Sequence, residues 1–317
     1  MHPVLFHLPM PWGEQPVYSY GVMLGTSLLV AWYTIMWLGE RKEKLPLELM
    51  RNAFIITAIS AIACARLLYA ATNLDEFHSL GDLINLQGGG LVAYGGFLGG
   101  LLGSWAYLRF KKASILAWAD LVAPTLGTGL GLVRVGCYLY GCDFGRPLSP
   151  NAPEFLRNWG TFPGRTDDMP DGSPAWARAV EAYDHSPLTG FSHPVHPTQL
   201  YESLVGFGLA TIAFLLWRKR QFRGQVILVV AVLYGIWRFL IEYVRDDPER
   251  GFYFGFSTSQ LISIGLVPVC ALLYYQLRKE HLLAPPAAEA EEKAPGDESP
   301  ATKPAKPKRR KKKKKKS

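Results

Sequence analysis

The chain has 317 residues, of which 49% are hydrophobic and only 19% are charged. The apolar residues come in long blocks rather than in alternation, which favours a membrane protein over one large soluble domain. The formal net charge is +8, but +7 of it falls in residues 284–317, so the rest of the chain is nearly neutral. No nucleic-acid-binding fold is evident. The four cysteines match neither a zinc pattern nor a disulfide framework, and we expect no metal and no cofactor.

Residues 1–16 are rich in proline and predict an interfacial lead-in. Seven apolar segments follow, long enough to cross a hydrocarbon core of about 30 Å at about 1.5 Å per residue. We expect the spans near 18–38, 53–71, 88–109, 121–140, 196–217, 225–243 and 257–275. The predicted fold is therefore all-α, a polytopic protein of seven transmembrane helices formed by residues 1–283.

The segment between the fourth and fifth spans, residues 142–196, is rich in Pro, Gly and Asp. It is too polar to span, so we expect a small cap outside the membrane. Lys and Arg gather after the first, third, fifth and seventh spans, and the positive-inside rule makes these loops cytoplasmic. The N-terminus and the cap are then outside, and the C-terminus is cytoplasmic.

Residues 284–317 are rich in Ala, Pro, Glu and Lys without apolar periodicity, so we expect a disordered tail. Its terminal basic run, residues 308–316, is a candidate contact for anionic lipids of the inner leaflet. A solvated tail without a specific partner is the alternative.

Arg134 lies deep within the apolar run of the fourth span. A guanidinium does not lose its proton in proteins, and at membrane depth it costs a few kcal/mol unless an anion or a water-filled cavity receives it. A lipid phosphate is such an anion. The span then breaks into the polar stretch 141–146.

Other polar side chains are expected at the same outer depth. Tyr234, Arg238 and Glu242 recur every four residues and share one helical face. Arg238 and Glu242 could simply pair, but several arginines at one depth exceed what neutralising Glu202 and Glu242 requires. The whole set is Tyr20, Arg66, Tyr94, Arg134, Arg146, His196, Tyr201, Glu202, Tyr234, Arg238, Glu242 and Arg245.

Motifs along the chain resemble the prolipoprotein diacylglyceryl transferase family. They are Tyr20-Gly21, GGLVAYGGFLGG at 89–100, RVGCYLYGCDFGRP at 134–147, HPTQLYES at 196–203, YGIWRFLIEYVRD at 234–246 and STSQLISI at 257–264. Each motif alone is a weak signal, whereas their order over residues 18–275 is specific.

The resemblance implies an enzyme of the bacterial inner membrane. It would transfer the diacylglyceryl group of phosphatidylglycerol to the lipobox cysteine thiol of a prolipoprotein and release glycerol phosphate. The catalytic residues implied are Tyr94, Arg134, Arg238 and Glu242, with both arginines on the phosphate. Fixed guanidinium donors suit this role because charge builds on phosphate as the carbon–oxygen bond breaks. The substrate-binding residues implied are Tyr20, Arg66, Gly95, Gly96, Arg146, His196, Tyr201, Glu202 and Tyr234.

The chain departs from the family pattern at four positions. Tyr94 stands where the family motif has histidine, and Cys137, Tyr140 and Cys142 stand where the signature has asparagines and a glutamate. A tyrosine is a poor base at neutral pH because its ordinary pKa is about 10. A hydrogen bond from Tyr94 to the substrate is therefore the alternative role.

Cys137 and Cys142 are predicted at the outer mouth of the site. They could form a disulfide in an oxidising compartment or be plain structural residues, or one could transiently accept a lipid. Two alternatives to the transferase also stay open. One is a paralogue with the same phospholipid pocket and another acceptor, and the other is a catalytically silent lipid-binding membrane protein.

Overall fold

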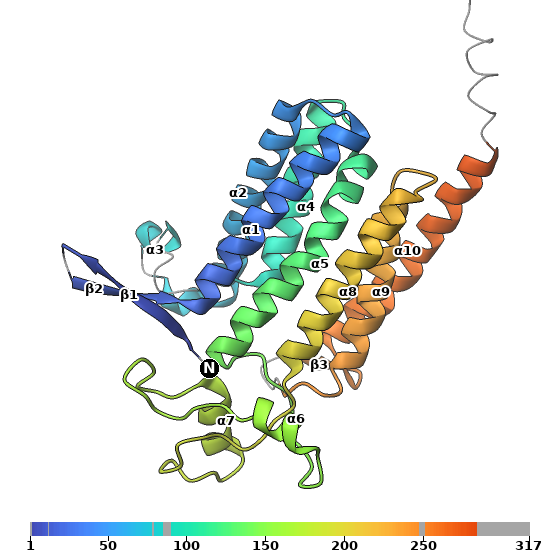
Figure 1. The fold of residues 1–317 in the computed structure, drawn as a ribbon. Coiled ribbons are helices and arrows are strands. Elements are labelled where there is room, and N and C mark those ends of the chain that lie inside the picture. The colour runs from blue at the N-terminus through green and yellow to red at the C-terminus, as the bar shows by residue number, and fades with distance from the viewer. Residues whose placement is uncertain (1, 12, 78, 85–89, 247–250, 284–317) are drawn as a thin grey trace, which may run out of the picture.

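The computed structural model describes residues 2–11, 13–77, 79–84, 90–246 and 251–283. Long helices that run roughly alongside one another dominate it (Figure 1). They are α1 (Ser19–Leu38), α2 (Leu47–Thr72), α4 (Ala93–Phe110), α5 (Ile115–Tyr140), α8 (Thr198–Arg218), α9 (Gln225–Ile241) and α10 (Thr258–Leu283). The mainly helical prediction is confirmed, while the predicted tail, 284–317, lies outside the described residues.

Five helices in the described part of the chain are long and apolar enough to cross a membrane, namely α1, α2, α5, α8 and α10. The protein is therefore a multi-pass membrane protein by length and composition. Helix α9 is apolar but has only 17 residues, so it is about 25 Å long. The crossing of the membrane by α4 and α9, and with it the count of seven, stays a prediction.

Two helices begin about six residues earlier than predicted. Helix α5 starts at Ile115, where the Ser114 side chain caps its first turn by accepting a hydrogen bond from the Ala117 N–H at 3.3 Å. Helix α2 starts at Leu47, directly after Pro46. Glu48 and Arg51 near the start of α2 and Asp120 near the start of α5 thus lie within the helices, although an apolar count leaves them outside a span.

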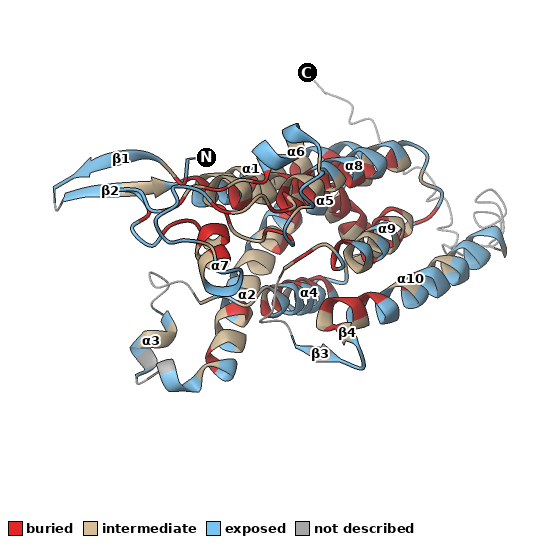
Figure 2. Ribbon diagram, turned by 90° about the horizontal axis from the view of Figure 1, so that it is seen from below, coloured by how far each residue is buried: buried red, intermediate tan, exposed pale blue. Residues whose placement is uncertain are grey.

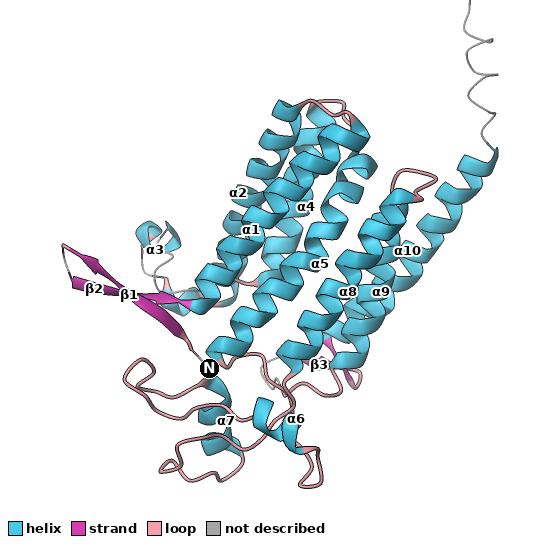
Figure 3. Ribbon diagram, viewed as in Figure 1, coloured by secondary structure: helices cyan, strands magenta, loops and turns pink. Residues whose placement is uncertain are grey.

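A β-hairpin precedes α1 and was not predicted from the sequence. Strand β1 (Val4–Met10) pairs antiparallel with β2 (Gly13–Tyr18), and the hairpin projects from the bundle (Figure 3). A second, shorter hairpin of β3 (Phe252–Tyr253) and β4 (Phe256–Ser257) precedes α10. The remaining short elements are η1 (Gly39–Glu43), η2 (Leu74–Glu76) and α3 (Leu80–Ile84).

Glycines bring α5 and α8 into close contact. A Cβ atom added at Gly127 would lie 2.5 Å from the Ala210 backbone nitrogen, and one added at Gly206 would lie 2.5 Å from that of Gly131. Only glycine lets the two backbones approach so closely. The Ser203 hydroxyl adds a hydrogen bond across this interface to the Gly131 carbonyl at 2.9 Å. Much of the buried surface in Figure 2 lies on these two helices.

The glycine run of α4 faces α2. A Cβ atom at Gly95 would lie 2.5 Å from the Cys64 carbonyl oxygen, and one at Gly99 or Gly103 would overlap Ser60. These glycines therefore serve the approach of two helices rather than the approach of a ligand.

Residues 142–196, here called the cap segment, connect α5 to α8. They contain two short helices, α6 (Glu154–Trp159) and α7 (Pro174–Ala182), and otherwise loops. A small apolar core holds the cap segment together; it consists of Phe144, Phe162, Ala175 and Val195. The cap segment and the β1–β2 hairpin lie at the same end of the long helices (Figure 1).

The opposite end of α5 carries a buried carboxylate. Asp120 accepts hydrogen bonds from the backbone N–H groups of Gly224 at 2.7 Å and Ile227 at 2.9 Å, so it caps α9. Arg220 pairs with Asp120 at 3.2 Å and also with Glu43. The polar groups of this end are thus joined to one another, well separated along α5 from Arg134.

Candidate functional site

Two arginines and two carboxylates form a closed network at the cap end of the bundle. Nε of Arg134 lies 2.7 Å from Glu202, and its Nη1 lies 2.6 Å from Asp143. Arg245 pairs with the same two carboxylates, at 3.0 Å from Glu202 and in direct contact with Asp143. Residues from α5, α8, the loop after α5 and the loop after α9 thus meet at one place.

Burial differs sharply among these four side chains. Glu202 is 0% exposed and Arg245 is 1% exposed, whereas Arg134 is 16% and Asp143 is 28% exposed. Glu202 and Arg245 are therefore shielded from solvent, whereas Arg134 and Asp143 form the accessible side of the network. Each buried charge is paired, as the cost of removing charges from water requires.

The end of α5 explains why Asp143 meets Arg134. Gly141 adopts a left-handed conformation with φ of 89° and ends the helix, and the Asp143 backbone is also left-handed at 58°. The first turn of α8 holds this reversed chain in place. Thr198 donates to the Asp143 carbonyl at 2.7 Å, and Gln199 donates to the Cys142 carbonyl at 2.6 Å.

A second polar cluster lies around Arg238 of α9. Its Nη1 pairs with Glu242 at 2.6 Å, and its Nη2 donates to the Ser259 hydroxyl at 2.8 Å. The Tyr94 hydroxyl lies 2.9 Å from the same Ser259 hydroxyl. Residues from α4, α9 and α10 are therefore joined, and Arg238 is 12% exposed.

Tyr234 connects the two clusters. It lies one turn before Arg238 on α9, and its phenol is close enough to Glu202 and Arg134 for their charges to act on it. Tyr20 of α1 has a similar relation to the first cluster, since it interacts with Arg134 and Asp143. The structure thus brings together eight of the residues proposed from the sequence: Tyr20, Tyr94, Arg134, Glu202, Tyr234, Arg238, Glu242 and Arg245.

Arg66 is placed differently. Its guanidinium donates to the backbone carbonyls of Asp82 at 2.6 Å, Gly90 at 3.0 Å and Leu83 at 3.2 Å. It also lies over the Phe77 ring at 4.9 Å. These contacts hold the connection between α2 and α4, which indicates a structural role rather than the predicted contact with substrate.

The remaining predicted residues lie beside the clusters without joining them. Arg146 is exposed, and its backbone pairs with that of His196. His196 Nδ1 lies 3.4 Å from the Tyr201 hydroxyl, and partial burial lowers the pKa of His196 below its ordinary value. Gly95 and Gly96 both face α2, where a Cβ atom at Gly95 would lie 2.5 Å from the Cys64 carbonyl oxygen and one at Gly96 would lie 3.7 Å from that of Ala61; their predicted contact with substrate stays a prediction.

Asp143 and Ser259 were not among the residues predicted for the site. The argument from the sequence weighed the arginines against Glu202 and Glu242 only, and Asp143 adds a third carboxylate. Among the described residues, three arginines, at 134, 238 and 245, face three carboxylates, at 143, 202 and 242. The glycine at 141 was the available signal, because a left-handed helix end turns the next residues back toward the last turn.

Two guanidinium nitrogens keep hydrogen-bonding capacity in this arrangement. Among the described residues, neither Nη2 of Arg134 nor Nε of Arg238 donates a hydrogen bond. Both side chains are partly exposed, in contrast to Arg245. Arg134 and Arg238 can therefore each donate to a further anion without releasing their carboxylates.

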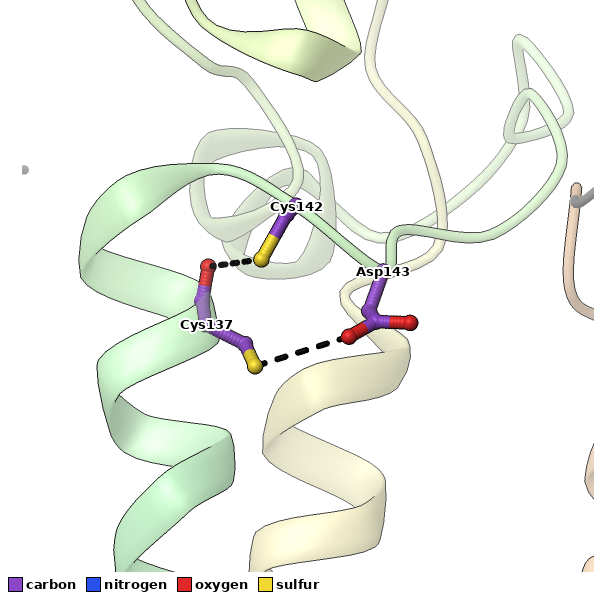
Figure 4. A group of neighbouring side chains, drawn as sticks. All are labelled: Cys137, Cys142 and Asp143. Atoms are coloured by element: carbon purple, nitrogen blue, oxygen red, sulfur yellow. Dashed lines mark hydrogen bonds between the residues drawn. The ribbon is translucent and has the colours of Figure 1, made fainter. Parts of the chain in front are cut away.

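Cys137 and Cys142 lie next to Asp143 (Figure 4). The Cys137 thiol lies 3.5 Å from Asp143 Oδ2 and 3.8 Å from Nη1 of Arg134. The Cys142 thiol lies 3.8 Å from the Cys137 carbonyl oxygen. Both cysteines are free thiols in the structure.

Comparison with known proteins shows the family of this chain. A model of the prolipoprotein diacylglyceryl transferase family matches residues 3–276. A phosphatidylglycerol–prolipoprotein diacylglyceryl transferase of Clostridium tetani is 31% identical over 268 residues, which cover 83% of this chain and 93% of the relative. One of Clostridium perfringens is 32% identical over 272 residues, covering 83% and 91%. One of Dehalococcoides mccartyi is 29% identical over 281 residues, covering 88% and 95%. The chain belongs to the prolipoprotein diacylglyceryl transferase family.

Proposed function

We propose that this protein transfers the diacylglyceryl group of phosphatidylglycerol to the lipobox cysteine thiol of prolipoproteins. The names of the relatives from Clostridium and Dehalococcoides support the lipid donor and the protein acceptor. The family match over residues 3–276 supports the reaction class, since it includes both arginine clusters.

The arrangement of Arg134 and Arg238 carries this proposal. They come from different helices, each is paired with a carboxylate, and both side chains remain partly exposed. A phosphate held by the two would lie beside Tyr234. Paired carboxylates fix both guanidiniums, so little reorganisation is needed when negative charge develops on the phosphate.

The proposed reaction forms one bond and breaks one bond. The thiol sulfur forms a bond to the glyceryl carbon as the bond between that carbon and the phosphate oxygen breaks. The phosphate takes the electron pair and leaves as glycerol phosphate, and the thiol loses its proton during the attack. Arg134 and Arg238 stabilise the leaving phosphate, and the Tyr94–Ser259 pair positions Arg238.

The proposed topology has seven spans, with α4 and α9 crossing alongside the five longer helices. The basic loops and the C-terminus face the cytoplasm of a bacterial inner membrane. The cap segment, the β1–β2 hairpin and both arginine clusters then face outward, where secreted precursors emerge. Residues 1–283 form the transferase unit, and residues 284–317 form a cytoplasmic tail that contacts anionic lipids through its lysines.

Expression in cells depleted of their own transferase tests the proposed function. We expect lipobox precursors to be modified again by the parent protein and by a matched control, Arg223→Lys, whose side chain is 57% exposed and far from the site. Unmodified precursors in cells that hold the folded parent protein in the membrane would overturn the proposal. Phosphatidylglycerol binding without transfer would then support the silent lipid-binding protein.

A further inference from the structure

The last turn of α5 brings Cys137 and Cys142 together through its own capping geometry. The Gly141 and Cys142 N–H groups both donate to the Cys137 carbonyl, at 2.8 and 3.1 Å. This is the hydrogen-bond pattern of a left-handed glycine cap, in which the third residue from the helix end contacts the second residue beyond it. Cys137 and Cys142 occupy these two positions. The cap therefore holds their side chains near each other without any long-range packing.

We propose that Cys137 and Cys142 form a disulfide in the mature protein. This inference rests on the proposed orientation, which places the end of α5 in an oxidising compartment. Cys142 is partly accessible and Cys137 is buried. The Cys142 thiolate attacks a disulfide of an external oxidant and forms a mixed disulfide with it. The Cys137 thiolate then attacks the Cys142 sulfur and displaces the oxidant, which leaves as a dithiol that carries the two electrons and takes up two protons through water in place of those that the cysteines lost.

A metal ion is the competing use of the same atoms. The two thiols and Asp143 offer three ligand atoms within 4.8 Å of one another. However, Arg134 and Arg245 already occupy both oxygens of Asp143, and the Arg134 guanidinium lies 3.8 Å from the Cys137 sulfur. A cation placed there would face two fixed positive charges at short range. A disulfide carries no charge, so the two guanidiniums do not repel it.

The disulfide would also act on the first cluster. In the structure the Cys137 thiol is directed at Asp143, and the Cys142 thiol is directed at the last turn of α5 (Figure 4). Oxidation removes the thiol hydrogen between Cys137 and Asp143 and ties the loop that carries Asp143 to α5. The position of Asp143 between Arg134 and Arg245 is thereby fixed covalently as well as by hydrogen bonds.

Thiol counting on the full-length protein tests this proposal. Cells are quenched with acid, the protein is denatured, and free thiols are labelled with a polyethylene-glycol maleimide with and without prior reduction. The chain has four cysteines, so we expect two labels without reductant, at Cys64 and Cys270, and four labels after reduction. Cys142→Ser should give three labels with and without reduction. The matched control Cys64→Ser should give one label without reduction and three labels after reduction.

Four labels in the unreduced parent protein would overturn the disulfide. If the thiols of Cys137 and Cys142 are protected in the folded protein until a chelator is added, and purified protein carries one equivalent of zinc, the metal site replaces the disulfide. Labelling does not depend on turnover, so its result is separate from that of the transferase assay. A disulfide in an inactive protein would contradict the proposed function alone, and four free thiols in an active one would contradict this inference alone.

Discussion

Arg134 and Arg245 share both of their carboxylate partners, Asp143 and Glu202. The two arginines nevertheless differ in access, since Arg134 is 16% exposed and Arg245 is 1% exposed. This relationship separates their roles. The buried Arg245 holds the two carboxylates in position, and the carboxylates in turn hold Arg134. The side chain of Arg134 is partly exposed and can contact a ligand.

Replacement of Arg245 should therefore act mainly on folding. Arg245→Gln leaves the buried Glu202 with a single cationic partner, and we expect the free energy of unfolding to fall by about 3–5 kcal/mol. Denaturant titration in detergent micelles measures this change. The matched control is Arg223→Gln, whose pair with Glu43 is more exposed, and it should cost less than about 1 kcal/mol. Equal stability of the two variants would contradict the structural role of Arg245.

Gly206 should be sensitive to the smallest enlargement. A methyl group there would meet the Gly131 backbone nitrogen at 2.5 Å, so we expect Gly206→Ala to destabilise the fold by about 1–3 kcal/mol. It should also separate Glu202 on α8 from Arg134 on α5 and lower transfer activity. Gly208 lies on the same helix with nothing within 4 Å of its added Cβ, so Gly208→Ala serves as the control and should leave both properties unchanged. Loss of stability in both variants would indicate a general helix effect rather than this contact.

Tyr94 should act through Ser259. Because the two hydroxyls form one hydrogen bond and Ser259 contacts Arg238, we expect Tyr94→Phe to lower kcat by about two- to tenfold. Ser259→Ala should cause a similar loss, and the double variant should lose little more than either single one. Tyr33→Phe, at a position that is 71% exposed on α1, is the control. A complete loss of activity in Tyr94→Phe with normal Ser259→Ala would instead assign proton transfer to Tyr94.

Features of the fold that depend on short stretches of sequence were predicted. The four-residue spacing of Arg238 and Glu242 predicted that they share one helical face and left their pairing open, and the apolar blocks predicted the long helices. Arg134 was correctly expected to need an anionic partner, but the structure supplies protein carboxylates where a lipid phosphate was the predicted anion. The pairing of Arg134 with Glu202 depends on the approach of α5 to α8, which no single segment reveals.

The predictions that differed from the structure concern long-range placement. Arg66 was grouped with the site because it lies near the end of a span, yet the chain between α2 and α4 folds back and supplies its carbonyl partners. Ser259 was missed because its motif gave no indication that α10 would meet α9 at Arg238. The β1–β2 hairpin was missed because Pro9 and Pro16 argue against strands, although both are tolerated on a two-stranded ribbon.

The central claim is that Arg134 and Arg238 together hold the phosphate of the lipid donor. The direct measurement is transfer from phosphatidylglycerol to a lipobox peptide in proteoliposomes, with release of glycerol phosphate followed in the same sample. Lysine keeps the charge but lacks the planar fork of arginine. We therefore expect Arg134→Lys and Arg238→Lys each to lower the rate by about 100-fold or more, whereas Arg223→Lys matches the parent protein. Parental rates in folded Arg134→Lys and Arg238→Lys would contradict the account.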